Sequence, residues 1–392
     1  MGRYRAKLHE DLTVIAYYVS DYGYGHAARS IAVIRKLLAD SPVPLHLVIN
    51  CGKALGFLYE SLQPFQGGHQ LEFRTIRSDT GYVLQPNSIA ADVEGLQKQY
   101  RHDMSLFDEQ VTQECDFLQR CRVQLVITDI SPVPIVAAAR AGIESLGISN
   151  FTWYTAYRDM LEPDELNVLR AAYAQMDHFI GLAGCAEPAW GCKDRIQTGF
   201  FCRQPDEQEV ERIRRKLASD GRQIVFFALG MSIEVEQLES LPIWDSENVS
   251  FIVSSNMTIE RDHIYRIPPD YSESQNYVAA ADLVITKPGW GTIGEAIVLN
   301  KPLLLLNRSQ FYEDRHTLDA IPAHHPVQLL SWEQISRLEL NRLNLNSFDF
   351  NPTEFNTDTV DSSQSLFQGM SGNCALTHIT RYIQNLLLHV SV

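Results

Sequence analysis

Apolar residues gather along the chain in short continuous runs, and stretches with helical spacing follow several of them. In the first half, the runs cover residues 13–19, 45–50, 71–76 and 124–129. Their β-branched and aromatic content is typical of buried parallel strands. After the first run, apolar residues from Ile31 to Leu38 recur as they would on one face of a helix. The alternation of strands and helices predicts a doubly wound α/β domain.

The same alternation restarts in the second half. Its strand-like runs cover residues 223–230, 250–255, 283–286 and 302–307. The junction is predicted at residues 198–208, and residues 341–373, rich in Asn, Ser and Thr, are typical of an irregular excursion. The predicted fold is therefore α/β, with two Rossmann-like parallel-sheet domains that face each other across a cleft. We expect an N-terminal domain at residues 1–200, a C-terminal domain at 201–374 and a final helix at 375–392, with the N-terminal domain as its candidate packing partner.

Composition narrows the classes of partner. The 392 residues carry a formal net charge of −15, which disfavours binding to nucleic acid or to an anionic membrane. The seven cysteines form no C-x-x-C pair and no D-x-D motif is present, so we expect neither a disulfide framework nor a metal site. No apolar run is long enough to span a bilayer, and the first one is typical of a strand rather than a signal peptide. We therefore expect a cytoplasmic protein, and the sequence leaves its oligomeric state open.

The segment YYVSDYGYGHAARSIAVIRKLL, at residues 17–38, places two glycines and a histidine between the first strand and the first helix. Gly23, Gly25 and an alanine after them fit the spacing G-x-G-x-x-A of a dinucleotide or phosphate cradle. A dinucleotide site also requires an acid at the end of the second strand, where residues 50–53 read NCGK. We therefore favour a sharp turn that presents His26, with NAD or FAD binding as the weaker alternative.

A second glycine loop, TKPGWGTIGE, covers residues 286–295 between a predicted strand and a predicted helix. Gly289, Gly291 and Thr292 would offer N–H groups and a hydroxyl at the positive end of that helix, where a phosphate is stabilised. The structural alternative is a capping box formed by Thr292 and Glu295.

A third loop, ALGMSIE, follows the first strand of the second half at residues 228–234. Its Gly230 and Ser232 are candidates to bind the same phosphates from another side. Alternatively, the loop is an ordinary turn in which Ser232 caps the next helix.

The stretch from Lys287 to Glu295 resembles the donor signature of the GT-B glycosyltransferases. In many members a His opens this motif, a Gly-Trp pair and a small polar residue follow, and a Glu closes it. This chain keeps the Gly-Trp pair, Thr292 and Glu295 at the same spacing, with Lys287 in the place of the His. The motif with Lys in this place is similar to the corresponding motif of the plant galactolipid synthases and of the N-acetylglucosaminyltransferase of lipid II synthesis. The resemblance implies that Lys287, Thr292 and the Gly291 amide hold the donor phosphates and that Glu295 holds the ribose hydroxyls.

Several other segments resemble the N-terminal, glycosyltransferase-like domain of plant L-arabinokinase. They are YGYGHAARS at the first glycine turn, SDTGYVLQPNSIAADV at 78–93, TDISPVPIVAAARAGI at 128–143 and SNFTWYTAY at 149–157. The resemblance covers most of residues 13–320 and does not extend to a kinase domain. In this family the N-terminal glycine turn carries the catalytic base, which corresponds to His26, and Asp129 matches the acid that orients the base.

The resemblance implies an inverting, metal-independent glycosyltransferase that uses a nucleoside-diphosphate sugar, in the first instance a UDP-sugar, and a hydroxyl acceptor that the sequence does not identify. No cofactor is implied beyond this co-substrate. A UDP-sugar epimerase or hydrolase on the same fold, and a non-catalytic nucleotide-sugar-binding protein, are the alternatives. For His26 and Asp129 the structural alternatives are a helix N-terminal residue bonded to backbone and the N-cap of the following helix.

The remaining candidates carry less specific signals. Glu313 and Asp314 stand where related enzymes bind the donor sugar hydroxyls, and Tyr271 either stacks on the base or packs under its own loop. Arg29 is expected to solvate a helix face, with a phosphate contact as the alternative. The acceptor side is assigned to Gly23, Gly25, Arg29 and Asp79.

Overall fold

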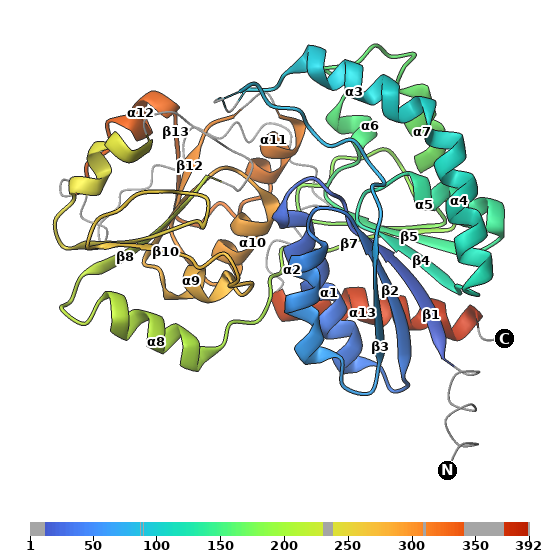
Figure 1. The fold of residues 1–392 in the computed structure, drawn as a ribbon, viewed down its shortest axis with the longest axis horizontal. Coiled ribbons are helices and arrows are strands. Elements are labelled where there is room, and N and C mark those ends of the chain that lie inside the picture. Colours follow the sequence, from blue (N-terminus) through green and yellow to red (C-terminus); the bar gives the residue numbers. More distant parts are fainter. Residues whose placement is uncertain are drawn as a thin grey trace. The chain divides into compact units, whose positions relative to one another are not determined.

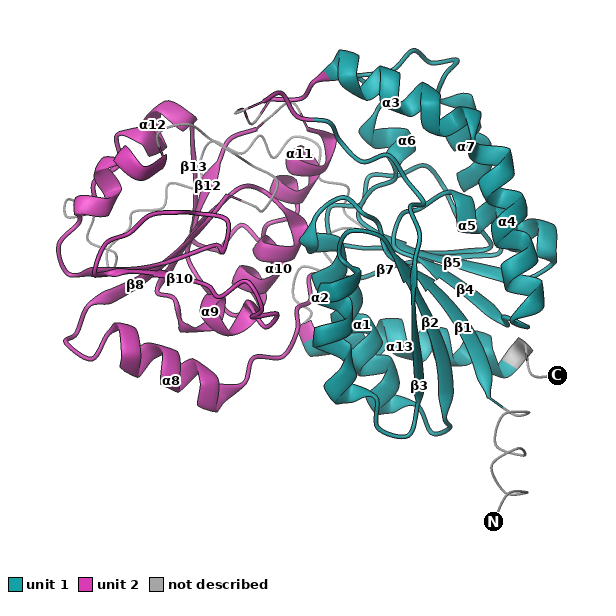
Figure 2. Cartoon of the chain, in the orientation of Figure 1, with its two compact units in different colours: residues 1–83, 93–198, 373–392 teal, residues 84–92, 199–372 magenta. Residues whose placement is uncertain are grey.

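The structure is a computed structural model that describes residues 12–86, 88, 90–229, 238–308, 311–340 and 372–390. The chain divides into two compact units, shown in Figure 2. Unit 1 contains residues 1–83, 93–198 and 373–392, and unit 2 contains residues 84–92 and 199–372. The excursion predicted at residues 341–373 lies outside the described residues except for its last two, which belong to a helix.

Unit 1 is built on a seven-stranded parallel sheet with the strand order β3-β2-β1-β4-β5-β6-β7 (Figure 1). Its strands are β1 (Thr13–Tyr18), β2 (Leu45–Cys51), β3 (Gln70–Thr75), β4 (Leu125–Thr128), β5 (Glu144–Ser149), β6 (His178–Gly181) and β7 (Asp194–Gln197). The order reverses between β1 and β4, which pair directly. In such sheets ligands bind at the carboxyl ends of the strands beside this reversal.

Helices cover both faces of this sheet. They are α1 (Tyr24–Asp40), α2 (Leu55–Leu62), α3 (Val93–Ser105), α4 (Phe107–Arg120), α5 (Val133–Ala141), α6 (Trp153–Ala156), α7 (Asn167–Tyr173) and α13 (Gly372–Val390), with a 3₁₀ turn at Gln63–Phe65. The apolar side chains of α4 and α5 pack on the sheet face that carries Ala16 and Tyr18 of β1. The C-terminal helix α13 is tied to unit 1 by Thr380, which donates to Asp40 at 3.0 Å, and by Tyr382, which donates to Asp194 at 2.9 Å.

Unit 2 repeats the scheme with a six-stranded parallel sheet of order β10-β9-β8-β11-β12-β13. Its strands are β8 (Gln223–Ala228), β9 (Val249–Val253), β10 (Ile264–Arg266), β11 (Leu283–Thr286), β12 (Leu303–Leu306) and β13 (Val327–Leu330). Its helices are α8 (Glu207–Leu217), α9 (Gln275–Ala280), α10 (Trp290–Val298), α11 (Tyr312–Asp319) and α12 (Trp332–Ser336), with 3₁₀ turns at Leu238–Ser240 and Pro242–Asp245. The core of unit 2 packs around the fully buried Trp244.

All eight predicted strands are found, and the α/β class with two parallel sheets is confirmed. Five strands, β5, β6, β7, β10 and β13, were not predicted from the sequence. They are three to six residues long, and β7 (DRIQ), β10 (IYR) and β13 (VQLL) are edge strands with polar positions that interrupt the apolar run. Edge strands need not be apolar on both faces, so the hydrophobic signal of these three short strands is weak.

Candidate functional site

The turn between β1 and α1 lies at the carboxyl edge of the unit 1 sheet. Gly23 has φ +81°, a left-handed conformation in which a side chain would be strained, and it directly precedes the helix. Asp21 accepts hydrogen bonds from the backbone N–H groups of Gly52 and Lys53, which fastens the turn to the loop after β2. Gly23 and Asp21 thus help to fix where α1 begins. Gly25 lies in the first turn of α1, where the structure leaves open space beside it.

His26 and Asp129 lie together at the strand reversal. Nδ1 of His26 is 2.7 Å from Oδ2 of Asp129, and both side chains are buried. The other carboxylate oxygen of Asp129 accepts from the N–H of Ser20 at 2.9 Å. The structural alternatives for both residues are therefore wrong, because the described contacts of His26 are with side chains and because the N-cap of α5 is Pro132.

Neighbouring charges affect the ionisation of Asp129. Burial would raise the pKa of Asp129, but the charges of His26 and Arg29 outweigh burial and hold it below its ordinary value. In the neutral tautomer that carries its proton on Nδ1, His26 donates this hydrogen bond to Asp129. Within the described part of the chain, Nε2 of His26 makes no hydrogen bond and is left to accept one.

Arg29 occupies a different place from the one predicted. It is 5% exposed, so it does not solvate a helix face. Its guanidinium donates to Asn150 at 2.6 Å and to Ser149 at 3.1 Å, and lies 2.9 Å from Nδ1 of His26 and 3.5 Å from Asp129. Arg29 is therefore a fixed positive charge behind the His–Asp pair. The sequence prediction failed because the helical position of Arg29 does not reveal that the β4 and β5 ends cover it.

Asp79 is the second carboxyl group of this neighbourhood. Its Oδ2 accepts from the Ser131 hydroxyl at 3.0 Å and from Trp153 Nε1 at 3.2 Å. Burial raises the pKa of Asp79, and the nearby charge of Asp129 raises it further. The Trp153 ring centroid lies 6.5 Å from that of His26, so Asp79 and the His–Asp pair share one aromatic neighbour.

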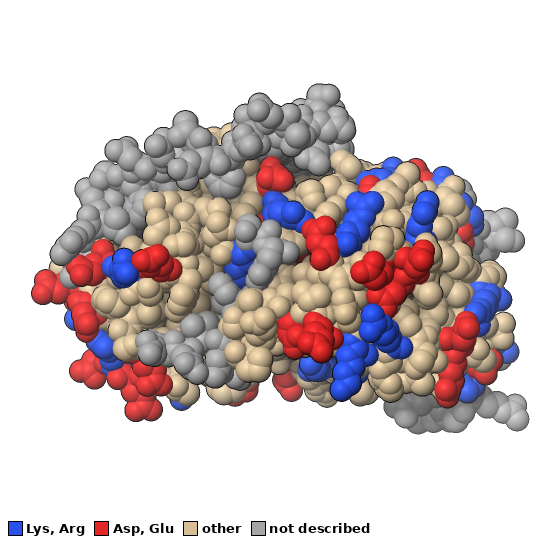
Figure 3. Space-filling model, turned by 90° about the horizontal axis from the view of Figure 1, so that it is seen from above, with Lys and Arg blue, Asp and Glu red and all other residues tan. Residues whose placement is uncertain are grey.

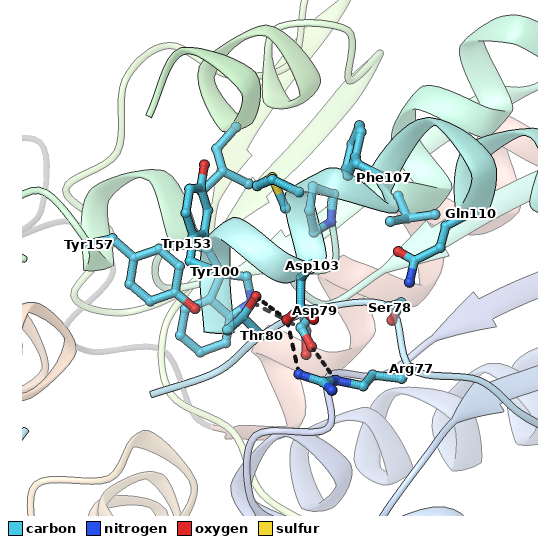
Figure 4. A pocket seen from close by; sticks show the side chains of 14 residues that line it. Arg77, Ser78, Asp79, Thr80, Tyr100, Asp103, Phe107, Gln110, Trp153 and Tyr157 are labelled. Carbon is cyan, nitrogen blue, oxygen red and sulfur yellow. Dashed lines mark hydrogen bonds and ion pairs between the residues drawn. The ribbon is translucent and has the colours of Figure 1, made fainter. Parts of the chain in front are cut away.

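Asp79 also lines a cavity of unit 1, shown in Figure 4. One wall carries Asp103, which accepts from Arg77 at 2.9 Å and from Thr80 at 2.7 Å. The opposite wall is aromatic, with Trp153 and Tyr157 stacked 5.2 Å apart. The cavity volume is about 20 Å³, which is room for roughly one water molecule. The cavity as it stands is therefore too small for a sugar or a larger acceptor.

In unit 2 the predicted phosphate residues lie at the carboxyl end of β11. The N-cap of α10 is Gly289 and its first intrahelical bond runs from Ile293 to Gly289, so the N–H groups of Gly291 and Thr292 precede the helical ladder. Thr292 is the third helical residue, and the capping-box alternative is wrong because no side-chain cap is formed. Lys287 stands just before the helix, and burial together with the charge of Arg308 lowers its pKa to about 8.

Glu295 is buried one turn further along α10 and pairs with Arg203, whose Nη2 lies 3.2 Å from Oε1. Burial raises the pKa of Glu295 and the Arg203 charge opposes that rise. Sequence analysis missed Arg203. The available signal was a single basic residue, Arg203, within the predicted junction 198–208.

The remaining candidates of unit 2 have these positions. Asp314 is buried in a two-pronged ion pair with Arg308, at 2.8 and 2.9 Å, and Glu313 beside it is partly exposed. The Tyr271 hydroxyl donates to Glu209 at 3.1 Å and accepts from Asn276 at 3.0 Å. Gly230 and Ser232 lie outside the described residues. Arg308, directly after the predicted strand 302–307, was also missed.

The described residues contain no group of three or more His, Cys, Asp or Glu side chains that could hold a metal ion. Among them, no helix is both long and apolar enough to cross a membrane. On the face shown in Figure 3, basic and acidic side chains are interspersed. That face, so far as it is described, therefore offers no continuous basic surface.

No protein-family model matches the chain. L-arabinokinase of Arabidopsis thaliana is 25% identical over 322 residues, which make up 77% of this chain and 29% of that protein. This chain thus spans less than a third of the length of the curated relative it matches.

Solved structures extend the likeness over almost the whole chain. The calicheamicin glycosyltransferase CalG4 has a TM-score of 0.59 at 10% identity and covers 97% of this chain and 100% of its own. UGT89C1 of Arabidopsis thaliana, solved in complex with UDP, has a TM-score of 0.60 at 12% identity and covers 94% of this chain and 99% of its own. The chain has the GT-B fold. At 10–12% identity the likeness establishes the GT-B architecture alone, so the chemistry has to be argued from the residues.

The buried charges of unit 1 give a first prediction. Asp129→Ala leaves His26 and Arg29 buried without their carboxylate, and removing one partner of a buried charged pair costs about 3–5 kcal/mol. We expect faster amide hydrogen exchange in β1, β4 and α1, measured by mass spectrometry, with β8 and β9 of unit 2 unchanged.

Asp108→Ala is the matched control, because it removes the exposed carboxylate that pairs with Arg140 at 2.8 Å. Exposed pairs contribute little, so exchange in this variant should stay near that of the wild type. Equal effects of the two substitutions would contradict the role given to the buried carboxylate.

Proposed function

We propose that this protein is a glycosyltransferase that transfers a sugar from a nucleoside-diphosphate sugar, in the first instance a UDP-sugar, to an acceptor hydroxyl. The observation that carries the proposal is the buried His26–Asp129 pair, in which Nε2 of His26 makes no hydrogen bond within the described residues. The GT-B fold supports it, since one structure with this fold is named a glycosyltransferase and another was solved with UDP bound.

In the proposed reaction, the acceptor hydroxyl gives its proton to Nε2 of His26 as its oxygen attacks C1 of the sugar. The bond from C1 to the diphosphate oxygen breaks, the nucleoside diphosphate leaves, and direct attack inverts the configuration at C1. Asp129 fixes the tautomer and stabilises the imidazolium that forms. A positioned general base contributes about 10²–10⁴ in rate.

The departing diphosphate gains negative charge, which groups of unit 2 would stabilise without a metal ion. Lys287 supplies a cation, and the N–H groups and hydroxyl at Gly291 and Thr292 supply donors at the start of α10. Gly230 and Ser232 remain candidates for the same role, and Glu295 for the ribose hydroxyls. Tyr271 remains a candidate for stacking on the base of the nucleotide.

Two neighbouring acids are candidates for the sugar hydroxyls. Asp314 already accepts two hydrogen bonds from Arg308, so Glu313 is the better candidate of the two acids. Asp79 and the turn of Gly23 and Gly25 remain candidates for the acceptor side. The acceptor itself stays unassigned.

A nucleotide panel tests the function. A ligand that binds only the folded state at 100 times its dissociation constant stabilises it by about 2.7 kcal/mol. We expect UDP and a UDP-sugar to raise the melting temperature, and NAD to leave it unchanged. Radiolabelled UDP-sugar incubated with cell extract should then yield label in a new acceptor. Interconversion of the UDP-sugar without an acceptor would instead identify an epimerase, and binding without any turnover a non-catalytic protein.

His26→Ala should abolish turnover and leave the dissociation constant for UDP within about twofold of the wild type, because the proposed base does not bind the nucleotide. His46→Ala is the control, since His46 pairs with Glu72 near the amino end of β2, at the opposite edge of the sheet. Both activity and UDP binding, measured by calorimetry, should survive that change. Loss of UDP binding in His26→Ala would refute the assignment of the base.

Lys287 predicts a pH dependence of nucleotide binding. Its pKa of about 8 means that the free protein loses this charge as the pH rises through 8. UDP affinity should therefore be highest below pH 8 and fall by up to about tenfold per pH unit above it. An arginine at this position keeps its charge at every accessible pH. The UDP affinity of Lys287→Arg should therefore stay constant between roughly pH 7 and pH 9.5.

Lys301→Arg is the matched control. Lys301 is also partly buried with a lowered pKa, but it precedes β12 at the amino edge of the unit 2 sheet. The control should keep the pH dependence of the wild type. If the UDP affinity of Lys287→Arg still falls above pH 8, the assignment of Lys287 to phosphate binding is wrong.

A further inference from the structure

Arg203 is the most deeply buried arginine among the described residues of unit 2. It is 2% exposed, and it lies in the segment that leads from β7 to α8. Its Nη1 donates to the backbone carbonyl of Ser272 at 2.6 Å, and its Nη2 donates to the Ser274 hydroxyl at 2.9 Å and to Glu295 at 3.2 Å. One guanidinium thus joins three segments of unit 2.

The placement of this charge calls for an explanation. Arginine cannot shed its proton, so burying it costs several kcal/mol unless charge and hydrogen bonds compensate. Glu295 is the carboxylate that compensates it. Oε1 of Glu295 takes the contact with Arg203, whereas Oε2 makes no hydrogen bond within the described residues.

The pairing has a consequence for Glu295. Burial favours the neutral acid, and the Arg203 charge favours the carboxylate. A carboxylate only accepts hydrogen bonds, whereas a protonated acid also donates. Arg203 therefore opposes the effect of burial and favours the form of Glu295 that accepts from hydroxyl groups, and it contacts the carboxylate through Oε1.

We propose that Arg203 is a positioning residue for nucleotide binding, which holds Glu295 through Oε1 so that Oε2 accepts a hydrogen bond from a ribose hydroxyl. This inference rests on the proposed function, because it takes Glu295 to be the ribose-binding acid. It adds the requirement that ribose recognition depends on a residue that does not touch the nucleotide.

The test measures selectivity for ribose rather than affinity alone. UDP, 2′-deoxy-UDP and 3′-deoxy-UDP are titrated into the full chain by calorimetry. A hydrogen bond to a charged group corresponds to roughly tenfold or more in affinity, so the wild type should bind at least one deoxy analogue about tenfold more weakly than UDP. In Arg203→Ala this ratio should fall to about twofold or less, with Arg203→Lys between the two.

Two further variants sharpen the result. Glu295→Gln should lose the same selectivity, and the double variant Arg203→Ala with Glu295→Gln should lose no more than either single change. Arg214→Ala is the control, since it breaks a pair with Asp282 at 3.0 Å just before β11, at the amino edge of the same sheet. It should keep the selectivity of the wild type.

The outcomes separate the two proposals. If the wild type binds UDP selectively and Arg203→Ala keeps the same selectivity, the role of Arg203 is wrong and the proposed function still stands. Equal binding of UDP and both deoxy analogues by the wild type overturns the ribose role of Glu295, and with it this inference. If the wild type binds no nucleotide, the proposed function and the inference fail together. If Arg203→Ala does not fold, the ratio in Arg203→Lys decides.

Discussion

At the carboxyl edges of both parallel sheets, buried carboxylates lie beside cationic side chains, and the candidate sites of both units depend on these pairs. Removing an ion from water costs several kcal/mol, which only close charges and hydrogen bonds offset. Asp129 follows β4 and is compensated by His26, Arg29 and the Ser20 amide. In unit 2, Glu295 and Asp314 each pair with a buried arginine. The acids thus dictate where the cationic side chains lie, and with them the loops that carry these side chains.

The kind of cation separates the chemistry of the two edges. At the edge of unit 1 the nearest partner of Asp129 is a histidine, a residue type that can accept and donate a proton, and Arg29 lies further away at 3.5 Å. At the edge of unit 2 the partners of Glu295 and Asp314 are arginines, which keep their charge. The first arrangement suits proton transfer, and the second suits the fixed orientation of a binding group. The division of labour proposed for the two units follows from this difference.

Sequence patterns located the strands that carry these edges, because strands such as β1, β4 and β11 are buried on both faces and are therefore uniformly apolar. The glycine turn singled out His26, and the resemblance to the GT-B donor signature singled out Lys287. The patterns could not show partners that are distant along the chain. Arg203 meets Glu295 across 92 positions, and Arg29 meets Asn150 across 121. Nothing local marks these two arginines as buried, and for Arg29 helical position indicated the opposite.

The two acids near His26 complete the argument for the direction of proton transfer. Asp129 has a charged neighbourhood that lowers its pKa against burial, whereas Asp79 is held by a hydroxyl and an indole, and its pKa is raised by burial. Sites that run acid–base chemistry commonly push the pKa values of neighbouring groups apart in this way. Asp129, whose pKa is lowered, faces Nδ1 of His26, and Nε2 is the ring nitrogen that makes no hydrogen bond within the described residues.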